Sequence, residues 1–322
     1  MQHFKNILCA VSANKPSKTI LERAVSLAEN NQAQLTIVDV IPRVTARIRL
    51  PDGGPFSADL QAATTAEHLR TLQSLTKPYQ QRLQIQHEVL VGTGFLEIIG
   101  AVLRNGHDLL LKSAENPSFI ERIFDSDDMQ LLRACPCPVL ITHQEEMSNY
   151  QSILAAVDFD PEEPDTVEPD LNQKILELAC SLALSDFAEL HVVHVWDAPG
   201  EITIRTWSDN PDEAAKSYVQ GVQSRHQTGL DHLHERLREY LGAEAYAYLS
   251  PEFHLHHGDA STAIPEIAKQ LQADLVVMGT VARTGIAGLL IGNTAETILE
   301  QLTCSVLAVK PPGFVSPVKL AE

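Results

Sequence analysis

The chain has 322 residues, and since single domains commonly have about 150 residues, two domains are expected. Its 24 lysine and arginine residues against 42 acidic residues give a net charge of −18, which disfavours binding to nucleic acid or to an anionic membrane surface. Hydrophobic residues make up 44% of the chain, which is ordinary globular usage and argues against a disordered chain.

Several features indicate a soluble cytoplasmic protein with no nucleic-acid or membrane partner. No apolar stretch approaches the roughly 20 residues that span a bilayer. Residues 1–6 lead directly into an apolar segment and do not resemble a signal peptide. The five cysteines are an odd number in a large chain, which suits a reducing compartment better than a disulfide framework.

The first half of the chain alternates strand and helix patterns. Short apolar runs at residues 7–11 and 34–40 predict strands buried on both faces, and helical spacing lies between them. After a long polar segment, Gly92-Thr93-Gly94 predicts a tight turn into a helix. The remaining elements are a helix over 95–104, a strand over 108–112, a last helix and a strand over 139–141.

The second half repeats this order. The matching segments are 153–157, 175–183, 189–195, Gly258 with a helix over 263–271, then 274–278 and 306–309. Duplication of a whole domain explains five matching elements. The prediction is two tandem doubly wound α/β domains, each with a five-stranded parallel sheet in the order 3-2-1-4-5 and flanking helices. They cover residues 1–145 and 150–312, and an extended C-terminal tail covers 313–322.

The segment leaving the fourth strand of the second copy is the main candidate for binding. Residues 279–296 contain several glycines, which allow close backbone approach to a ligand. A helix is predicted to start just after Asn293, and its free N–H groups would favour an anion. Ligands of open parallel sheets bind beyond the carboxyl ends of the strands, where this segment lies.

Residues 279–296, followed by 302–307, resemble the universal stress protein family, in its tandem form with two family domains in one chain. Nucleotide-binding members carry Gly, two residues, Gly, nine residues, Gly and then Ser or Thr, with an Asp ending strand one. The resemblance implies an ATP or AMP site in domain 2, with Asp158 facing the adenosine and Gly279 and Gly292 lining the phosphates. The candidate cofactor-binding residues are Asp158, Val195, Gly258, Gly279, Ala282, Arg283, Gly292, Asn293 and Thr294.

Two positions depart from the family pattern. Ala282 occupies the second glycine position, and Asn293 stands where Ser or Thr would contact phosphate. Asn293 can still donate a hydrogen bond from its amide. Its spacing to Glu296 also fits a capping box, in which Asn293 would serve the helix rather than a ligand.

The first copy has lost the pattern. Aligning the copies at Gly92 and Gly258 places Lys112, Ser113, Asn116 and Ser126 opposite Met278, Gly279, Ala282 and Gly292. The corresponding loop has no glycine, and Asp125, Asp127 and Asp128 stand at the next helix start, where they repel an anion. Ser12 replaces the aspartate after strand one. This copy is therefore predicted to be structural or to take another ligand.

Other polar clusters are interpreted as structural. His254, His256 and His257 gather at a strand end and are candidates for ligand contact, but nothing nearby in sequence completes a metal site; His191 and His194 point to opposite faces of their strand. No metal site is predicted. Cys135 and Cys137 are interpreted as small buried residues.

The favoured function is a non-enzymatic stress-response protein that binds a small ligand, an adenine nucleotide in domain 2, and recognises a protein partner not identified by sequence. One alternative is a slow ATPase in the same place. Another is a carrier of an apolar or acyl ligand in domain 1, motivated by Phe119, Ile120, Ile123 and Phe124. The resemblance also implies an internal pseudo-dimer through the two fifth strands, or a homodimer.

Overall fold

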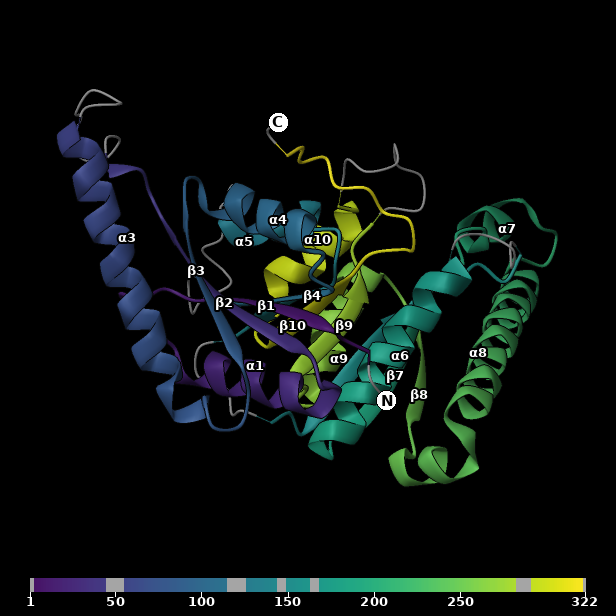
Figure 1. Cartoon of the computed structure of the whole chain (residues 1–322). Coiled ribbons are helices and arrows are strands. Elements are labelled where there is room, and N and C mark those ends of the chain that lie inside the picture. Colours follow the sequence, from purple (N-terminus) through teal and green to yellow (C-terminus); the bar gives the residue numbers. More distant parts are fainter. Residues whose placement is uncertain are drawn as a thin grey trace. The chain divides into compact units, whose positions relative to one another are not determined.

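A computed structural model describes residues 3–44, 55–114, 126–143, 149–162, 168–281 and 291–320 (Figure 1). The chain divides into two compact units. The first comprises Met1–Asn149, Thr280–Gly292 and Thr303–Glu322, and the second comprises Tyr150–Gly279 and Asn293–Leu302. Each unit is α/β, as the alternating sequence pattern predicts.

The first unit is built on a sheet with the order β3-β2-β1-β4-β5, which confirms the predicted order 3-2-1-4-5. These five strands are parallel. The elements are β1 (Asn6–Ala10), α1 (Lys18–Asn31), β2 (Gln34–Ile41), α3 (Pro55–Thr76), η1 (Lys77–Tyr79), β3 (Ile85–Val91), α4 (Gly94–Asn105), β4 (Leu109–Ser113), α5 (Asp127–Ala134) and β5 (Val139–Thr142).

The last strand of the chain, β10 (Ser305–Val309), belongs to the first unit and pairs antiparallel with β5. Val306 lies opposite Ile141 and Ala308 lies opposite Val139. The predicted meeting of the two fifth strands is therefore confirmed. It covers an edge of β5 that would otherwise expose unpaired backbone groups.

The second unit contains strands in the order β9-β6-β7-β8, all parallel. This is the order of the first four strands of the first unit. Its elements are β6 (Ser152–Val157), α6 (Glu168–Asp186), β7 (Glu189–Trp196), α7 (Glu201–Trp207), α8 (Pro211–Leu249), β8 (Glu252–His257), α9 (Ala260–Gln270), β9 (Leu275–Gly279) and α10 (Asn293–Gln301).

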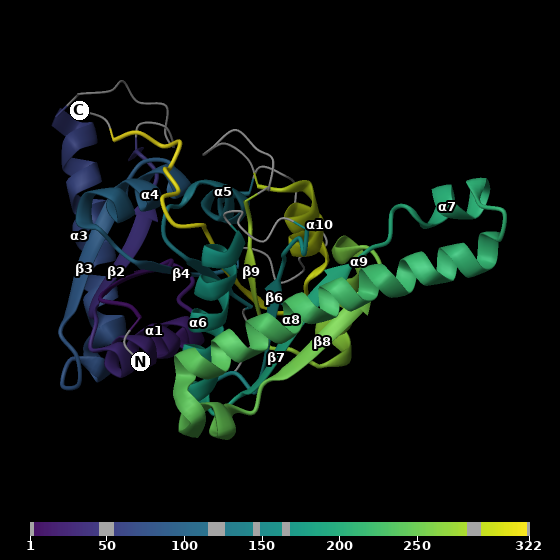
Figure 2. The same cartoon turned by 90° about the vertical axis from the view of Figure 1, so that its right-hand side faces the viewer.

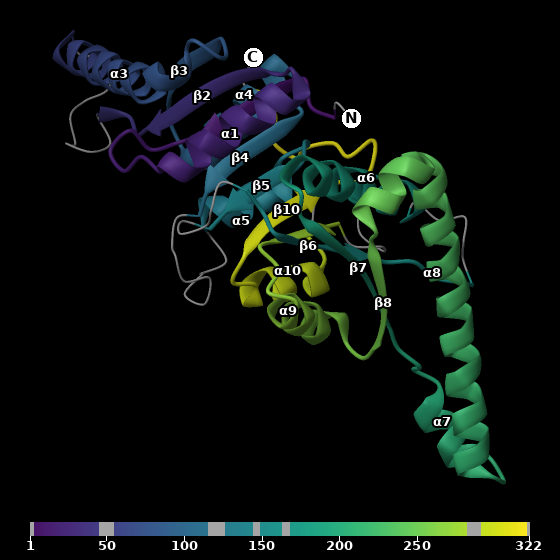
Figure 3. The same cartoon turned by 90° about the horizontal axis from the view of Figure 1, so that it is seen from below.

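Helices cover both faces of the second unit's sheet. Figure 3 shows α6 and α8 on one side of β6, β7 and β8, with α9 and α10 on the other. This arrangement follows from right-handed crossovers, because the chain steps outward from β6 to β8 and then returns to place β9 beside β6. Figure 2 shows the length of α8, with α7 beside its N-terminal part; non-helical backbone at Gly242 (φ 75°) interrupts α8 near its end.

Burial explains why the strands lack the alternation of a one-sided sheet. All six residues of β6 are buried, since both faces of a parallel sheet are covered by helices. The strand β10, which pairs antiparallel with β5, is buried throughout as well. In contrast, β8 is the edge strand of the second unit and keeps several polar side chains. Among the described residues, no helix combines the length and the apolar character needed to cross a membrane.

Candidate functional site

The carboxyl ends of β6 and β9 form the topological switch point of the second unit, because β7 and β8 lie on one side of β6 and β9 on the other. Ala156 pairs with Met278, so Asp158 and Gly279 follow the last paired residues at the same edge of the sheet. Ligands of doubly wound sheets bind at such a point. Two of the nine candidate residues therefore stand where the fold predicts a binding site.

The backbone at Asp158 is held by a side chain from α6. The Asp158 N–H donates to Asn172 Oδ1 at 3.0 Å, and Asn172 Nδ2 donates to the Asp158 carbonyl at 2.7 Å. Asn172 is buried, whereas Asp158 is exposed. This two-way amide contact fixes the turn after β6 and leaves the carboxylate at the protein surface.

Gly279, the last residue of β9, lies close to α6. A Cβ atom added there would approach Leu171 Cδ2 to 2.8 Å. A side chain at this position would displace the end of the Leu171 side chain, so glycine permits close packing of the strand end against the helix.

Aromatic and imidazole rings stack at the same ends of β6 and β7. Phe159 stacks on His194 with ring centroids 3.8 Å apart, and His226 from α8 stacks on His194 at 5.0 Å. Trp196 lies 5.8 Å from the His226 ring. Gly229 lets Phe159 lie against α8, since a Cβ atom there would be 2.3 Å from Phe159 Cε2.

Hydrogen bonds within this ring cluster define which nitrogens carry protons. His194 Nδ1 is 3.3 Å from the Val157 carbonyl, which can only accept, so His194 Nδ1 carries a proton. In neutral His194 the other nitrogen, Nε2, then accepts from His226 Nδ1 at 2.8 Å. The cluster packs flat rings beside the Asp158 turn.

The remaining candidate residues have varied positions. Val195 is half-buried in β7, and Gly258 connects β8 to α9. Asn293 and Thr294 are exposed in the first turn of α10, as the sequence predicts. In the first unit, the Gly292 N–H donates to the Thr280 carbonyl at 3.1 Å. Ala282 and Arg283 lie outside the described residues.

In the first unit the corresponding strand end carries an ion pair. Lys112 Nζ is 2.6 Å from Asp128 Oδ1, and both side chains are largely buried. Ser126 is the N-cap of α5, with its hydroxyl accepting from Met129 N at 3.3 Å. The predicted acidic helix start is present, but Asp128 is directed at a lysine of the neighbouring strand rather than serving the helix end alone.

A second acidic contact lies near the carboxyl end of β2 in the first unit. Asp39 Oδ2 is 2.6 Å from His68 Nδ1 of α3 and accepts from the Ala13 N–H at 3.1 Å. Asp39 is buried. The first unit thus fills its strand ends with contacts between its own side chains. Phe119, Ile120, Ile123 and Phe124, proposed for an apolar carrier, lie outside the described residues, as do Asn116 and Asp125.

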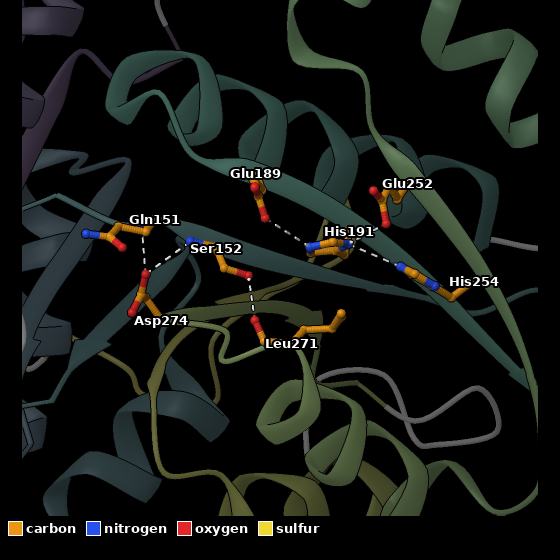
Figure 4. Close-up of polar contacts among 8 residues, drawn as sticks. All are labelled: Gln151, Ser152, Glu189, His191, Glu252, His254, Leu271 and Asp274. Atoms are coloured by element: carbon orange, nitrogen blue, oxygen red, sulfur yellow. Dashed lines mark hydrogen bonds and ion pairs between the residues drawn. The ribbon is translucent and has the colours of Figure 1, made fainter.

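The three histidines of β8 separate onto two faces. His257 packs on Trp196 with ring centroids 4.4 Å apart, on the side of the ring cluster. His254 faces the other way and meets His191 of β7, a contact that the sequence analysis did not predict (Figure 4). Burial, with a smaller contribution from His191, lowers the pKa of His254 below its ordinary value.

Cys135 and Cys137 are buried, as predicted, and their sulfur atoms are 3.5 Å apart. The hydrogen bond from the Cys137 thiol lowers the pKa of Cys135, whereas the same bond and burial raise that of Cys137. Beside them is a buried lysine that sequence reasoning missed. Lys310 Nζ donates to the Leu132 carbonyl at 2.6 Å and to Thr280 Oγ1 at 2.5 Å, and burial lowers its pKa to about 7.

Sequence reasoning also missed Asn172, Phe159 and His226. Phe159 directly follows Asp158, so its position next to the strand end was a readable signal. Asn172 lies 14 residues after Asp158 in α6, and His226 lies in the more distant α8. No spacing rule in the sequence predicts that either side chain contacts a strand end.

Comparison with known proteins identifies the family. The universal stress protein family model matches residues 3–143 and again residues 149–310. The chain belongs to the universal stress protein family. The two matches correspond to the two copies recognised in the sequence, and the resemblance of residues 279–296 is thereby confirmed at the level of the family.

Named members of this family are similar over the whole chain. Universal stress protein E of Escherichia coli strain K12 is 29% identical over 332 residues, covering 100% of this chain and 99% of its own. The universal stress protein E homolog of Haemophilus influenzae is 27% identical over 321 residues, covering 96% and 98%.

Solved structures agree. A putative universal stress protein from Pseudomonas aeruginosa UCBPP-PA14 matches with a TM-score of 0.64 and 26% identity, covering 96% of this chain and 94% of its own. A universal stress protein from Archaeoglobus fulgidus, 18% identical, shares the fold with a TM-score of 0.60 and coverage of 95% and 98%.

Proposed function

We propose that this universal stress protein is a non-catalytic, cytoplasmic stress-response protein whose second unit binds an adenine nucleotide, ATP or AMP, and that occupancy alters recognition of a protein partner. The observation that carries the proposal is the exposed Asp158 carboxylate at the switch point between β6 and β9, on a turn held by Asn172. A carboxylate in this position accepts hydrogen bonds from the hydroxyls of a ribose.

Two further features of the second unit support a nucleotide. Beside Asp158, the half-buried Phe159 and His226 are the rings of the cluster against which a base can pack, since His194 and Trp196 are buried. The first turn of α10 has exposed Asn293 and Thr294, whose side chains and backbone N–H groups favour a phosphate.

The first unit supplies a natural contrast. Lys112 and Asp128 pair where the second copy has Met278 and Thr294, and Ser12 stands at the position of Asp158. An anion arriving there would meet the Asp128 carboxylate at the start of α5. We therefore assign the nucleotide to the second unit alone.

Calorimetry with ATP, AMP and cyclic AMP tests the proposal on the full chain. Asp158→Ala removes a charged acceptor, and the expected loss is about 10- to 150-fold in affinity, since such a hydrogen bond is worth about 1.5–3 kcal/mol. The matched control is Ser12→Ala at the equivalent position of the first copy, which should leave the affinity unchanged. Absence of binding at millimolar nucleotide refutes the proposal.

The same samples test for catalysis. Phosphate release from ATP should stay at background in the wild type. Release above background that disappears in Asp158→Ala would replace the non-catalytic proposal with the slow ATPase.

A further inference from the structure

A cluster of imidazole and carboxylate groups lies on the edge of the second unit's sheet, on the opposite face of β8 from His257. His191 of β7 pairs in register with Glu252 of β8, and His254 is two residues further along β8. Because side chains two apart on a strand share a face, all three point to the same side. Figure 4 shows His191 between Glu189, Glu252 and His254.

We propose that His191, Glu252 and His254 bind a divalent transition-metal ion, Zn²⁺, through two imidazole nitrogens and one carboxylate oxygen. The ligand atoms of the three residues all lie within 4.8 Å of one another. Two histidines and a glutamate form a recognised set of zinc ligands, which leaves a fourth position for water or another ligand.

The observed spacing matches tetrahedral zinc. Bonds of roughly 2.0–2.1 Å at a tetrahedral angle separate two ligand atoms by about 3.3 Å. His191 Nδ1 is 3.2 Å from His254 Nε2 and 3.5 Å from Glu252 Oε2. The third pair, Glu252 and His254, lies within the 4.8 Å that encloses all three ligand atoms, so side-chain rotations that close this separation bring the three groups onto one ion.

A second carboxylate stands on the far side of His191. Glu189 Oε2 lies 3.9 Å from His191 Nε2, the nitrogen that does not face the other two groups. Metal-bound histidines commonly donate this second N–H to a carboxylate, which fixes the ring and strengthens the bond to the metal. Glu189 is exposed and can close this distance by rotating.

The burial pattern fits an ion held at the surface with an open position. The His191 side chain is 7% exposed, so it is a rigid anchor, whereas that of Glu252 is 69% exposed and borders solvent. A charged residue alone would be ordinary protection for an edge strand. Two histidines facing it on adjacent strands are not explained by edge protection.

The competing explanation is a direct hydrogen bond between the two imidazoles without any ion. Their 3.2 Å separation also fits that bond. The two explanations differ in whether the wild-type chain takes up metal through these residues, and binding experiments separate them.

The test uses the full chain, stripped of metal with a chelator and titrated with Zn²⁺ by calorimetry and with Co²⁺ by visible spectroscopy. The wild type should bind Zn²⁺ and show the intense visible bands of four-coordinate Co²⁺. Mg²⁺ should not compete, since it prefers oxygen ligands. His254→Gln and Glu252→Gln should each remove one equivalent of Zn²⁺ and the Co²⁺ bands.

Matched variants make the outcome specific. His257→Gln, on the opposite face of the same strand, should bind as the wild type does. Glu189→Gln should weaken Zn²⁺ binding about 10- to 100-fold, the usual effect of removing a partner of a metal-bound histidine. Added Zn²⁺ should raise the melting temperature of the wild type and His257→Gln but not of His254→Gln, because the ion binds only folded protein.

Two results overturn the proposal. One is equal Zn²⁺ stoichiometry in the wild type, Glu252→Gln and His254→Gln. The other is wild-type protein with no four-coordinate Co²⁺ spectrum. Nucleotide affinity is not part of this readout, so failure of the zinc proposal leaves the proposed function standing, and the reverse also holds.

Discussion

Lys310 should make the stability of the protein depend on pH in a way that an exposed lysine does not. Only 6% of Lys310 is exposed, and burial lowers its pKa from the ordinary 10.5 to about 7. Replacing it by methionine retains much of the apolar stem and removes the titrating amine. The change tested is therefore Lys310→Met.

The sign follows from the two pKa values. Below pH 7 both the folded and the unfolded chain hold the proton, and the folded chain bears the full cost of burying the charge. Between pH 7 and 10.5 the unfolded chain holds more protons, so the free energy of unfolding rises with pH. Since each pKa unit is worth about 1.4 kcal/mol, the total rise from Lys310 is about 5 kcal/mol.

The difference between the wild type and Lys310→Met over a narrow pH range separates this effect from the titration of other groups. Between pH 7 and 8 the pKa values predict a gain of about 1 kcal/mol from Lys310, because the folded lysine is about half protonated at pH 7 and nearly neutral at pH 8. Urea denaturation of the wild type at pH 6, 7 and 8 measures the free energy of unfolding, with constant slope on urea as the check that the same transition is compared.

Lys310→Met should lack this gain of about 1 kcal/mol between pH 7 and 8, whatever its stability at pH 7. The exposed Lys319→Met, in the same C-terminal segment, should keep the wild-type pH dependence. Identical pH profiles for the wild type and Lys310→Met would refute the reasoning, because a buried amine with a lowered pKa must contribute to the slope.

Two other substitutions test the packing of the strand ends. Asp128→Ala should lower the free energy of unfolding by about 3–5 kcal/mol, because it removes the carboxylate that pairs with Lys112 Nζ in a largely buried position. In urea denaturation, the double variant with Lys112→Met should recover a large part of this loss. Recovery of none of it would contradict the ion-pair explanation. Gly229→Val should lower the free energy of unfolding by about 1–3 kcal/mol, because the new side chain would push Phe159 off α8. Gly221→Val in the same helix should have almost no effect, since its Cβ would meet only the end of a flexible arginine at 3.9 Å. Equal losses in the two variants would contradict close packing at Phe159.

The architecture was largely predictable from local patterns. Apolar runs such as residues 7–11 and 153–157 became β1 and β6, because strands buried on both faces need apolar side chains at every position. The repeated order of elements predicted two copies, and the match of the family model to both halves agrees. The turn predicted at Gly92-Thr93-Gly94 separates β3 from α4 as expected.

The candidate site was predictable only in part. Asp158 and Gly279 could be located because they end strands, and strand ends are visible as the points where apolar runs stop. Asn172 and Leu171, which contact these strand ends, both lie in α6. The sequence of this helix predicts which of its faces is apolar, but it does not predict which strand end that face contacts.

Sequence alone therefore determined what repeats within this chain, namely the strand and helix order and the residues that end each strand, since these depend on local hydrophobic periodicity. Tertiary structure decided the pairings across strands and helices. Among these are His191 with His254, His194 with His226, Lys112 with Asp128 and buried Lys310 with Thr280. The physical reason is that the charge, pKa and hydrogen bonding of a side chain depend on the groups next to it in space. The fold brings these groups together from different strands and helices, and the spacing of residues along the sequence does not predict which of them meet.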